Sequence, residues 1–173
     1  MAEGMDFDSL VARYYEPLYQ FAFSLTRDEA DACDLVQQSF CIWANKGHQL
    51  RDLTKVKTWL FTTLHREFLS ACRKRTRFPH VELEHAAADL PVITPPTVNQ
   101  LDTSQVLLAL AQLDEVYQAP VALFYLQDYS YNEIASILEV PLGTVKSRLA
   151  RGLERLHQLL TGEKKTTLKQ NNL

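Results

Sequence analysis

The chain has 173 residues, of which 46% are hydrophobic, and its 18 basic and 21 acidic side chains give a formal net charge of −3. A protein that binds duplex DNA tightly without help usually carries an excess of positive charge, so this balance argues against a free-standing DNA binder. No apolar run approaches a membrane span, and the acidic first thirty residues lack a signal-like core, so we expect a cytoplasmic protein.

The three cysteines form no CxxC pair, and the five histidines show no metal-ligand spacing. HExxH and GxGxxG motifs are absent, and GEKKTT near the C-terminus lacks the upstream glycine of a phosphate loop. We therefore expect neither a metal site nor a disulfide framework. These patterns favour a protein without a cofactor or catalytic activity of its own.

The first half of the chain is predicted to be a succession of helices. Apolar residues recur at the helical period over residues 7–25, and Pro17 is expected to kink or break that helix. Asp28 is a plausible cap for the next helix, at residues 29–45. That helix has an apolar stripe (Ala32, Leu35, Val36, Phe40, Trp43) and a polar one (Asp34, Gln37, Gln38, Cys41).

After a polar loop at residues 44–53, a third helix is predicted over 55–77. Its inward residues are expected to be Leu53, Val56, Trp59, Leu60, Thr63, Leu64, Phe68 and Ala71. Another stripe carries Arg66, Ser70, Arg73 and Arg77. This stripe could follow a phosphate backbone, or it could simply complement the helix dipole at the C-terminal end. The stripe alone leaves both interpretations open.

Between Phe78 and Glu115 there is no Lys or Arg, and four prolines stand in the first part. We expect residues 79–100 to be an extended acidic linker. The predicted fold is therefore all-α, with a first helical domain at 1–78, a second at 101–160 and a polar tail at 161–173.

The segment YSYNEIASILEVPLGTVKSRLARG, at 129–152, has the pattern of a helix-turn-helix. Ser130 and Glu133 form a capping box, and Pro141 places a turn near 139–141. In the next helix, 142–157, Val145, Leu149, Leu153 and Leu156 share one stripe, whereas Thr144, Ser147, Arg148, Arg151 and Arg155 lie nearly opposite. An ordinary amphipathic surface helix is the alternative, but the capped short helix, tight turn and basic second helix together favour DNA binding.

Several motifs resemble those of bacterial RNA polymerase sigma factors, in particular the small extracytoplasmic-function (ECF) group. They are DLVQQSF at 34–40 with Trp43, TWLF at 58–61, the basic run at 73–77 and PLGTVKSRLARGLERL at 141–156. The resemblance covers roughly residues 7–77 and 104–159. It implies a factor that binds core RNA polymerase through the β′ coiled coil and the β flap, recognises promoter DNA, helps to melt it and initiates transcription.

The resemblance also assigns roles to residues. The minus-thirty-five element would be read by Thr144, Lys146, Ser147, Arg148, Arg151 and Arg155. Candidate contacts to the minus-ten region are His48, Arg51, Arg66, Ser70, Arg73 and Arg77. Core polymerase would dock on Asp31, Asp34, Gln37 and Phe40. An anti-sigma factor or a kinase would be a candidate regulator.

Two departures from the family pattern carry expectations of their own. Cys33 and Gln38 stand where acidic residues are usual, which predicts weaker docking on core polymerase, and a phosphate on Ser39, Thr54 or Thr58 could restore negative charge. Leu64-His65-Arg66 replaces a common Ala-Arg-Asn run, which favours a phosphate contact for Arg66 over a base contact.

Two functions from other classes remain as alternatives. A conventional helix-turn-helix regulator would bind duplex DNA without polymerase, but it leaves the DLVQQSF helix unexplained. A purely structural adaptor would need no arginine face on the helix at 142–157.

Overall fold

The computed structural model describes residues 6–77 and 98–162, and within these ranges it contains helices and no strands. The first helical unit consists of α1 (Phe7–Thr26), α2 (Glu29–Lys46) and α3 (Val56–Arg77). The second consists of α4 (Val98–Ala111), α5 (Glu115–Gln127), α6 (Tyr131–Leu138) and α7 (Leu142–Thr161). Side chains are described from Thr103 onward in α4. The all-α prediction is confirmed.

Helix boundaries in the first unit follow local chemistry. Asp28 caps α2 by accepting a hydrogen bond from the amide of Asp31 at 2.9 Å, as predicted. Arg27 ends α1 in the left-handed conformation, with φ of 60°. Pro17 lies inside α1, which continues past it as one helix, so of the kink or break expected there the break does not occur. Of the polar loop predicted at 44–53, residues 44–46 belong to α2. Two short 3₁₀ turns, Gly47–Gln49 and Leu53–Lys55, lie between α2 and α3.

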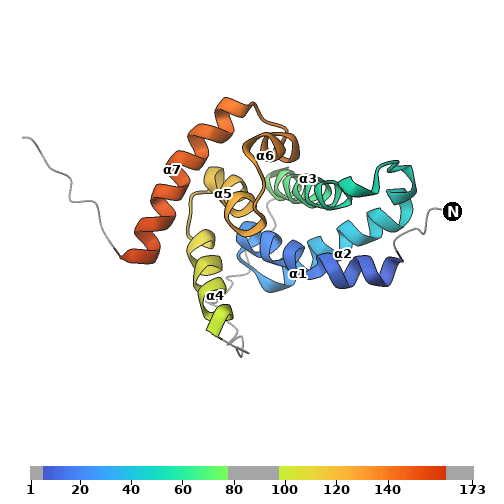
Figure 1. Cartoon of the computed structure of the whole chain (residues 1–173), viewed down its shortest axis with the longest axis horizontal. Helices are drawn as coiled ribbons and strands as arrows, with labels where there is room; N and C mark the ends of the chain where they lie inside the picture. The colour runs from blue at the N-terminus through green and yellow to red at the C-terminus, as the bar shows by residue number, and fades with distance from the viewer. Residues whose placement is uncertain (1–5, 78–97, 163–173) are drawn as a thin grey trace, which may run out of the picture.

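The core is continuous across the two units. In the first unit, the largest fully buried side chains are Leu10, Leu18, Phe21, Leu60, Phe61 and Leu64. In the second they are Leu110, Leu113, Leu123, Ile134, Ile137 and Leu149. These residues belong to one hydrophobic cluster, because α1 packs against α4 and α5 while α3 packs against α6 (Figure 1). The two units therefore form a single packed body.

The linker predicted at 79–100 lies largely outside the described residues, and its last positions belong to α4, which begins at Val98. Leu53 was expected to face inward but is 41% exposed. It lies in a 3₁₀ turn before α3, so the helical period does not place it on the buried side. No described helix is long and apolar enough to cross a membrane.

Candidate nucleic-acid interface

The turn between α6 and α7 is built by local hydrogen bonds. The amide of Ser130 donates to the Glu133 carboxylate at 2.8 Å, and the Glu133 amide donates back to the Ser130 hydroxyl at 3.3 Å. These bonds complete the predicted capping box and lower the pKa of Glu133. Glu139 ends α6 with φ of 56°, and Pro141 precedes α7 in an extended conformation. The turn lies where the sequence predicted it.

Helix α7 has one buried and one exposed side. Val145, Leu149 and Leu156 are buried, each no more than 2% exposed. Gly152 lets α7 approach α5 closely, since a Cβ atom there would meet Val121 and lie 3.1 Å from Cβ of Tyr117. The six residues predicted to read DNA are all exposed or half-buried: Thr144, Lys146, Ser147, Arg148, Arg151 and Arg155. Hydroxyl and cationic donors thus lie along the outer side of this helix, as a major-groove helix requires.

A second cationic surface follows α3 and the loop before it. His48 and Arg51 are exposed on that loop, and Arg73 and Arg77 are exposed at the far end of the helix. Because α3 has 22 residues, the two groups are separated by roughly 30 Å along its axis. The structure thus distributes the predicted minus-ten residues along the whole helix rather than gathering them in one pocket. Ser70 is half-buried between them.

Arg66, the middle member of this set, already has a partner. Its Nε and Nη2 groups both donate to Oε1 of Glu139, at the end of α6. This ion pair joins the first helical unit to the turn of the helix-turn-helix. A helical pattern within α3 could not have revealed it, because the two residues are 73 positions apart.

The candidate docking helix α2 presents a polar surface. Asp34 and Gln37 are exposed, and Asp31 is half-buried. Phe40 is only 6% exposed, because it packs edge-on against Phe7 with ring centroids 6.3 Å apart. In this arrangement Phe40 supports the helix from inside, whereas Asp34 and Gln37 face outward.

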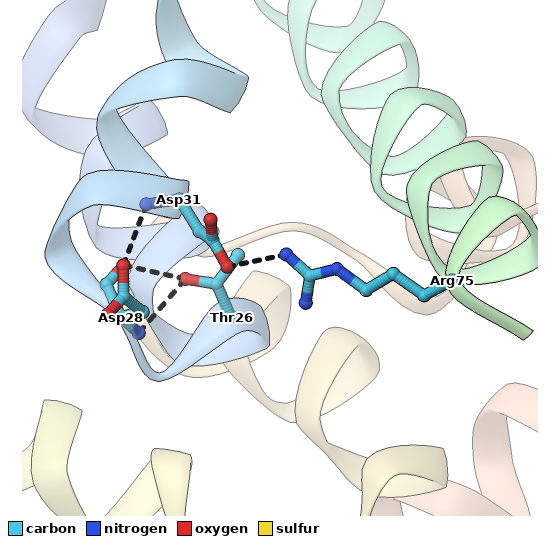
Figure 2. A network of polar contacts seen from close by, with 4 residues as sticks. All are labelled: Thr26, Asp28, Asp31 and Arg75. Atoms are coloured by element: carbon cyan, nitrogen blue, oxygen red, sulfur yellow. Dashed lines mark hydrogen bonds and ion pairs between the residues drawn. The ribbon is translucent and has the colours of Figure 1, made fainter. Parts of the chain in front are cut away.

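Asp31 takes part in a network that sequence analysis missed. Arg75, near the end of α3, donates to its carboxylate at 2.7 Å, while the Asp31 amide donates to Asp28 (Figure 2). The hydrogen bond to Asp31 and its negative charge raise the pKa of Arg75. Asp31 and Arg75 line a groove of about 270 Å³ between α2 and α3, together with Asp34 and Glu67. Arg75 belongs to the basic run at 73–77, but the spacing of that run did not single it out.

The three hydroxyls considered for phosphorylation differ in access. Ser39 is fully buried and donates to the Leu35 carbonyl at 2.8 Å, so a kinase could reach it only after local unfolding. Ser39 is therefore a poor candidate. Thr58 is half-buried, whereas Thr54 is exposed and donates to Asp52 at 2.6 Å.

The fold and its two cationic surfaces are those of a helical DNA-binding protein. Comparison with protein families agrees: residues 10–78 match "Sigma-70 region 2" and residues 103–156 match "Sigma-70, region 4". The chain is 31% identical to the ECF RNA polymerase sigma factor SigL of Mycobacterium tuberculosis, over 92% of this chain and 91% of SigL. It is 27% identical to the ECF factor SigM of Bacillus subtilis, over 90% and 95% of the two chains.

A solved structure agrees as well. The sigma factor RpoE of Bartonella quintana, in complex with the anti-sigma factor NepR, has a TM-score of 0.75 and 30% identity, with 93% of this chain and 100% of that chain covered. CnrH, in complex with the cytosolic domain of CnrY, shares the fold, with a TM-score of 0.59 and 24% identity. The chain belongs to the ECF group of RNA polymerase sigma factors. Such proteins bind core polymerase and direct it to promoters without being enzymes themselves.

Proposed function

We propose that α7 reads the minus-thirty-five element of the promoters this factor serves. The observation that carries the proposal is the outer side of α7, which presents four cationic side chains and two hydroxyls. This helix comes directly after the capped helix α6 and a tight turn. Residues near the start of a recognition helix contact base edges, and those farther along contact phosphates. Thr144, Ser147 and Arg148 therefore select bases, while Arg151 and Arg155 hold the backbone.

The minus-ten region is assigned to α3 and the loop before it. Arg73 and Arg77 are exposed and carry the charge that a displaced single strand requires. His48 and Arg51 extend this surface beyond the start of the helix. Polymerase supplies much of the remaining DNA affinity, which fits the net charge of −3. The factor works in the cytoplasm, together with polymerase.

Core polymerase docks on the outer side of α2, and its β′ coiled coil is the proposed partner there. Asp34 and Gln37 are exposed for direct contact, whereas Asp31 must first share or release Arg75. Phe40 is not exposed for direct contact; it stabilises the position of α2 by packing against Phe7. The β flap contacts the second helical unit.

An anti-sigma protein is the proposed regulator. The RpoE structure, which covers nearly all of this chain, is that of a complex with the anti-sigma factor NepR. A protein of that kind would hold the factor away from polymerase until a signal releases it. A kinase is the second candidate regulator, and of the three hydroxyls Thr54 is the most accessible substrate.

Run-off transcription from a pool of genomic fragments tests the proposal. Purified core polymerase is used with and without this protein, and with an Arg148→Ala variant. The proposal predicts discrete new transcripts that share two upstream elements, with transcripts lost or weakened in the variant. Specific duplex binding by the protein alone, with no transcripts, would contradict it.

A further inference from the structure

The loop that connects α2 to α3, residues 47–55, has two tryptophans at its base. Trp43 in the last turn of α2 and Trp59 in the first turn of α3 pack edge-on, with ring centroids 5.1 Å apart. Both side chains are half-buried. The pair therefore holds together the two helix ends that the loop connects.

Gly47 lies directly on the Trp43 ring. It is the one buried residue of the loop, and its amide donates to the Trp43 carbonyl. Its backbone is helical, with φ of −58°, so no left-handed conformation requires a glycine here. The ring requires it instead, because a Cβ atom on Gly47 would lie 2.6 Å from both Cδ2 and Cε2 of Trp43. Trp43 cannot move aside without losing its contact with Trp59.

The far end of the loop is anchored by hydrogen bonds. The Asp52 carboxylate accepts from the amide and the hydroxyl of Thr54, at 3.0 and 2.6 Å, and so begins the 3₁₀ turn that leads into α3. Between the two anchors, Leu50 packs against the hydrophobic core, and its amide donates to the Gly47 carbonyl at 3.0 Å. Only residues 48–51 lie between the anchors.

The anchored loop exposes two side chains proposed to contact DNA, His48 and Arg51. A loop that is free to move loses conformational entropy each time it binds, whereas a loop held at both ends has lost that freedom already. Selective contacts also need the contacting groups to be placed within about 0.5 Å. The anchors therefore hold the backbone of His48 and Arg51 in place for a selective contact.

We propose that Gly47, Trp43 and Trp59 are positioning residues for promoter reading, because they set the place at which His48 and Arg51 meet the minus-ten element. The inference rests on the proposed function, which assigns His48 and Arg51 to that element. The three positioning residues act through the loop rather than by contact with DNA. Their substitution alters discrimination among minus-ten sequences and leaves the reading of the minus-thirty-five element by α7 intact.

A purely structural role for the two tryptophans and the glycine predicts a different result. Loss of packing at the end of α2 would lower stability, and with it the amount of active factor, on every promoter alike. A positioning role instead changes the ratio of transcripts between promoters that differ by one base. This ratio does not depend on how much of the factor is active.

Run-off transcription with core polymerase and the full chain measures this ratio. The templates are a promoter recovered with the parent protein and its single-base substitutions in the minus-ten and in the minus-thirty-five element. Gly47→Ala places a methyl group against the Trp43 ring and displaces the loop. The double variant Gly47→Ala/Trp43→Phe combines the methyl group with a smaller ring that leaves room for it. Val36→Ala, at a fully buried position of α2, is the control for lost stability.

Gly47→Ala is expected to lower discrimination among minus-ten sequences about tenfold, the size of one good base contact, and to keep discrimination at the minus-thirty-five element. The added Trp43→Phe change should restore most of the lost discrimination, and Val36→Ala should leave both ratios unchanged. Parent-like minus-ten discrimination in Gly47→Ala, or an equal loss at both elements, would overturn the positioning role.

Should Gly47→Ala not fold, Trp59→Phe takes its place, because its smaller ring withdraws from Trp43. The same selective loss is then expected, at about threefold, as for one weakened aromatic pair. The parent protein separates this inference from the proposed function. If the parent transcribes all minus-ten variants equally, the minus-ten assignment fails. If the parent discriminates among them and the folded variant does so equally well, the positioning role alone fails.

Discussion

Arg75 binds Asp31 across the groove between α3 and α2, with Nη2 2.7 Å from Oδ2 (Figure 2). Asp31 is one of the carboxylates proposed to meet core polymerase, and its side chain is 37% exposed while that of Arg75 is 71% exposed. On the proposed docking helix, one carboxylate is therefore already paired with a cation from its own chain. Cys33 and Gln38, on the same helix, add no negative charge to this proposed docking surface.

Removing this internal cation should strengthen docking. An Arg75→Ala variant frees Asp31, and we expect its affinity for core polymerase, measured without DNA, to rise about twofold to fivefold. The effect is small because solvent screens an exposed ion pair. Lys74→Ala removes the same charge from the neighbouring position, where no ion pair with Asp31 exists in the described structure. If both variants bind equally tightly, net charge rather than the Asp31 pairing controls docking.

A glycine substitution tests the packing of the DNA-reading helix. In Gly152→Ala the new methyl group meets Val121 and Tyr117, and overpacking at such a site costs about 1 to 3 kcal/mol of unfolding free energy. Gly143→Ala lies in the same helix, where a Cβ atom meets nothing within 4 Å, so that variant should be neutral or slightly stabilising. Denaturant unfolding measures both. Equal stability in the two variants would mean that α7 does not approach α5 so closely.

Acid should destabilise the protein through His65. Burial lowers the pKa of His65 to about 4, although the Glu139 charge opposes the shift. The histidine is therefore neutral in the folded protein, whereas the unfolded chain takes up a proton below pH 6.5. Its contribution to stability is complete above pH 6.5 and falls toward pH 4, by about 2 to 3 kcal/mol after allowance for its partial exposure.

Because carboxylates also titrate in this range, the effect is measured as a difference between variants. Unfolding free energy from pH 7 to pH 4 should decline less steeply in His65→Gln than in the parent protein. His157→Gln, at an exposed position on α7, should follow the parent curve. A parallel curve for His65→Gln would show that His65 titrates normally.

Much of the fold was predictable because it depends on neighbours in sequence. The Ser130–Glu133 capping box and the buried side of α7 follow directly from spacings of three and four residues. The two ion pairs join distant positions: Asp31 and Arg75 are 44 residues apart, and Arg66 and Glu139 are 73 apart. Helical periodicity carries no information about such pairs, so they became visible only in the packed structure.

The recognition helix offers a direct test of base selection. Arg148 lies early in α7, and Arg148→Ala should lower occupancy of a target promoter by polymerase about tenfold, since a good base contact is worth about 1 to 3 kcal/mol. Arg13→Ala removes an equal charge from the exposed side of α1, a helix that has no contact with α7. Comparable losses in the two variants would point to a general charge effect instead.

Site-directed photo-crosslinking in the open promoter complex tests the central claim most directly. A photoreactive amino acid replaces Ser147 on α7 in one sample and Arg73 on α3 in another, each assembled with core polymerase on the same promoter. The account predicts crosslinks near −35 from position 147 and near −10 from position 73, at sites about 25 base pairs apart. Crosslinks from both positions to a single stretch of duplex would contradict it, because they would mean that the two helical units bind DNA as one packed body.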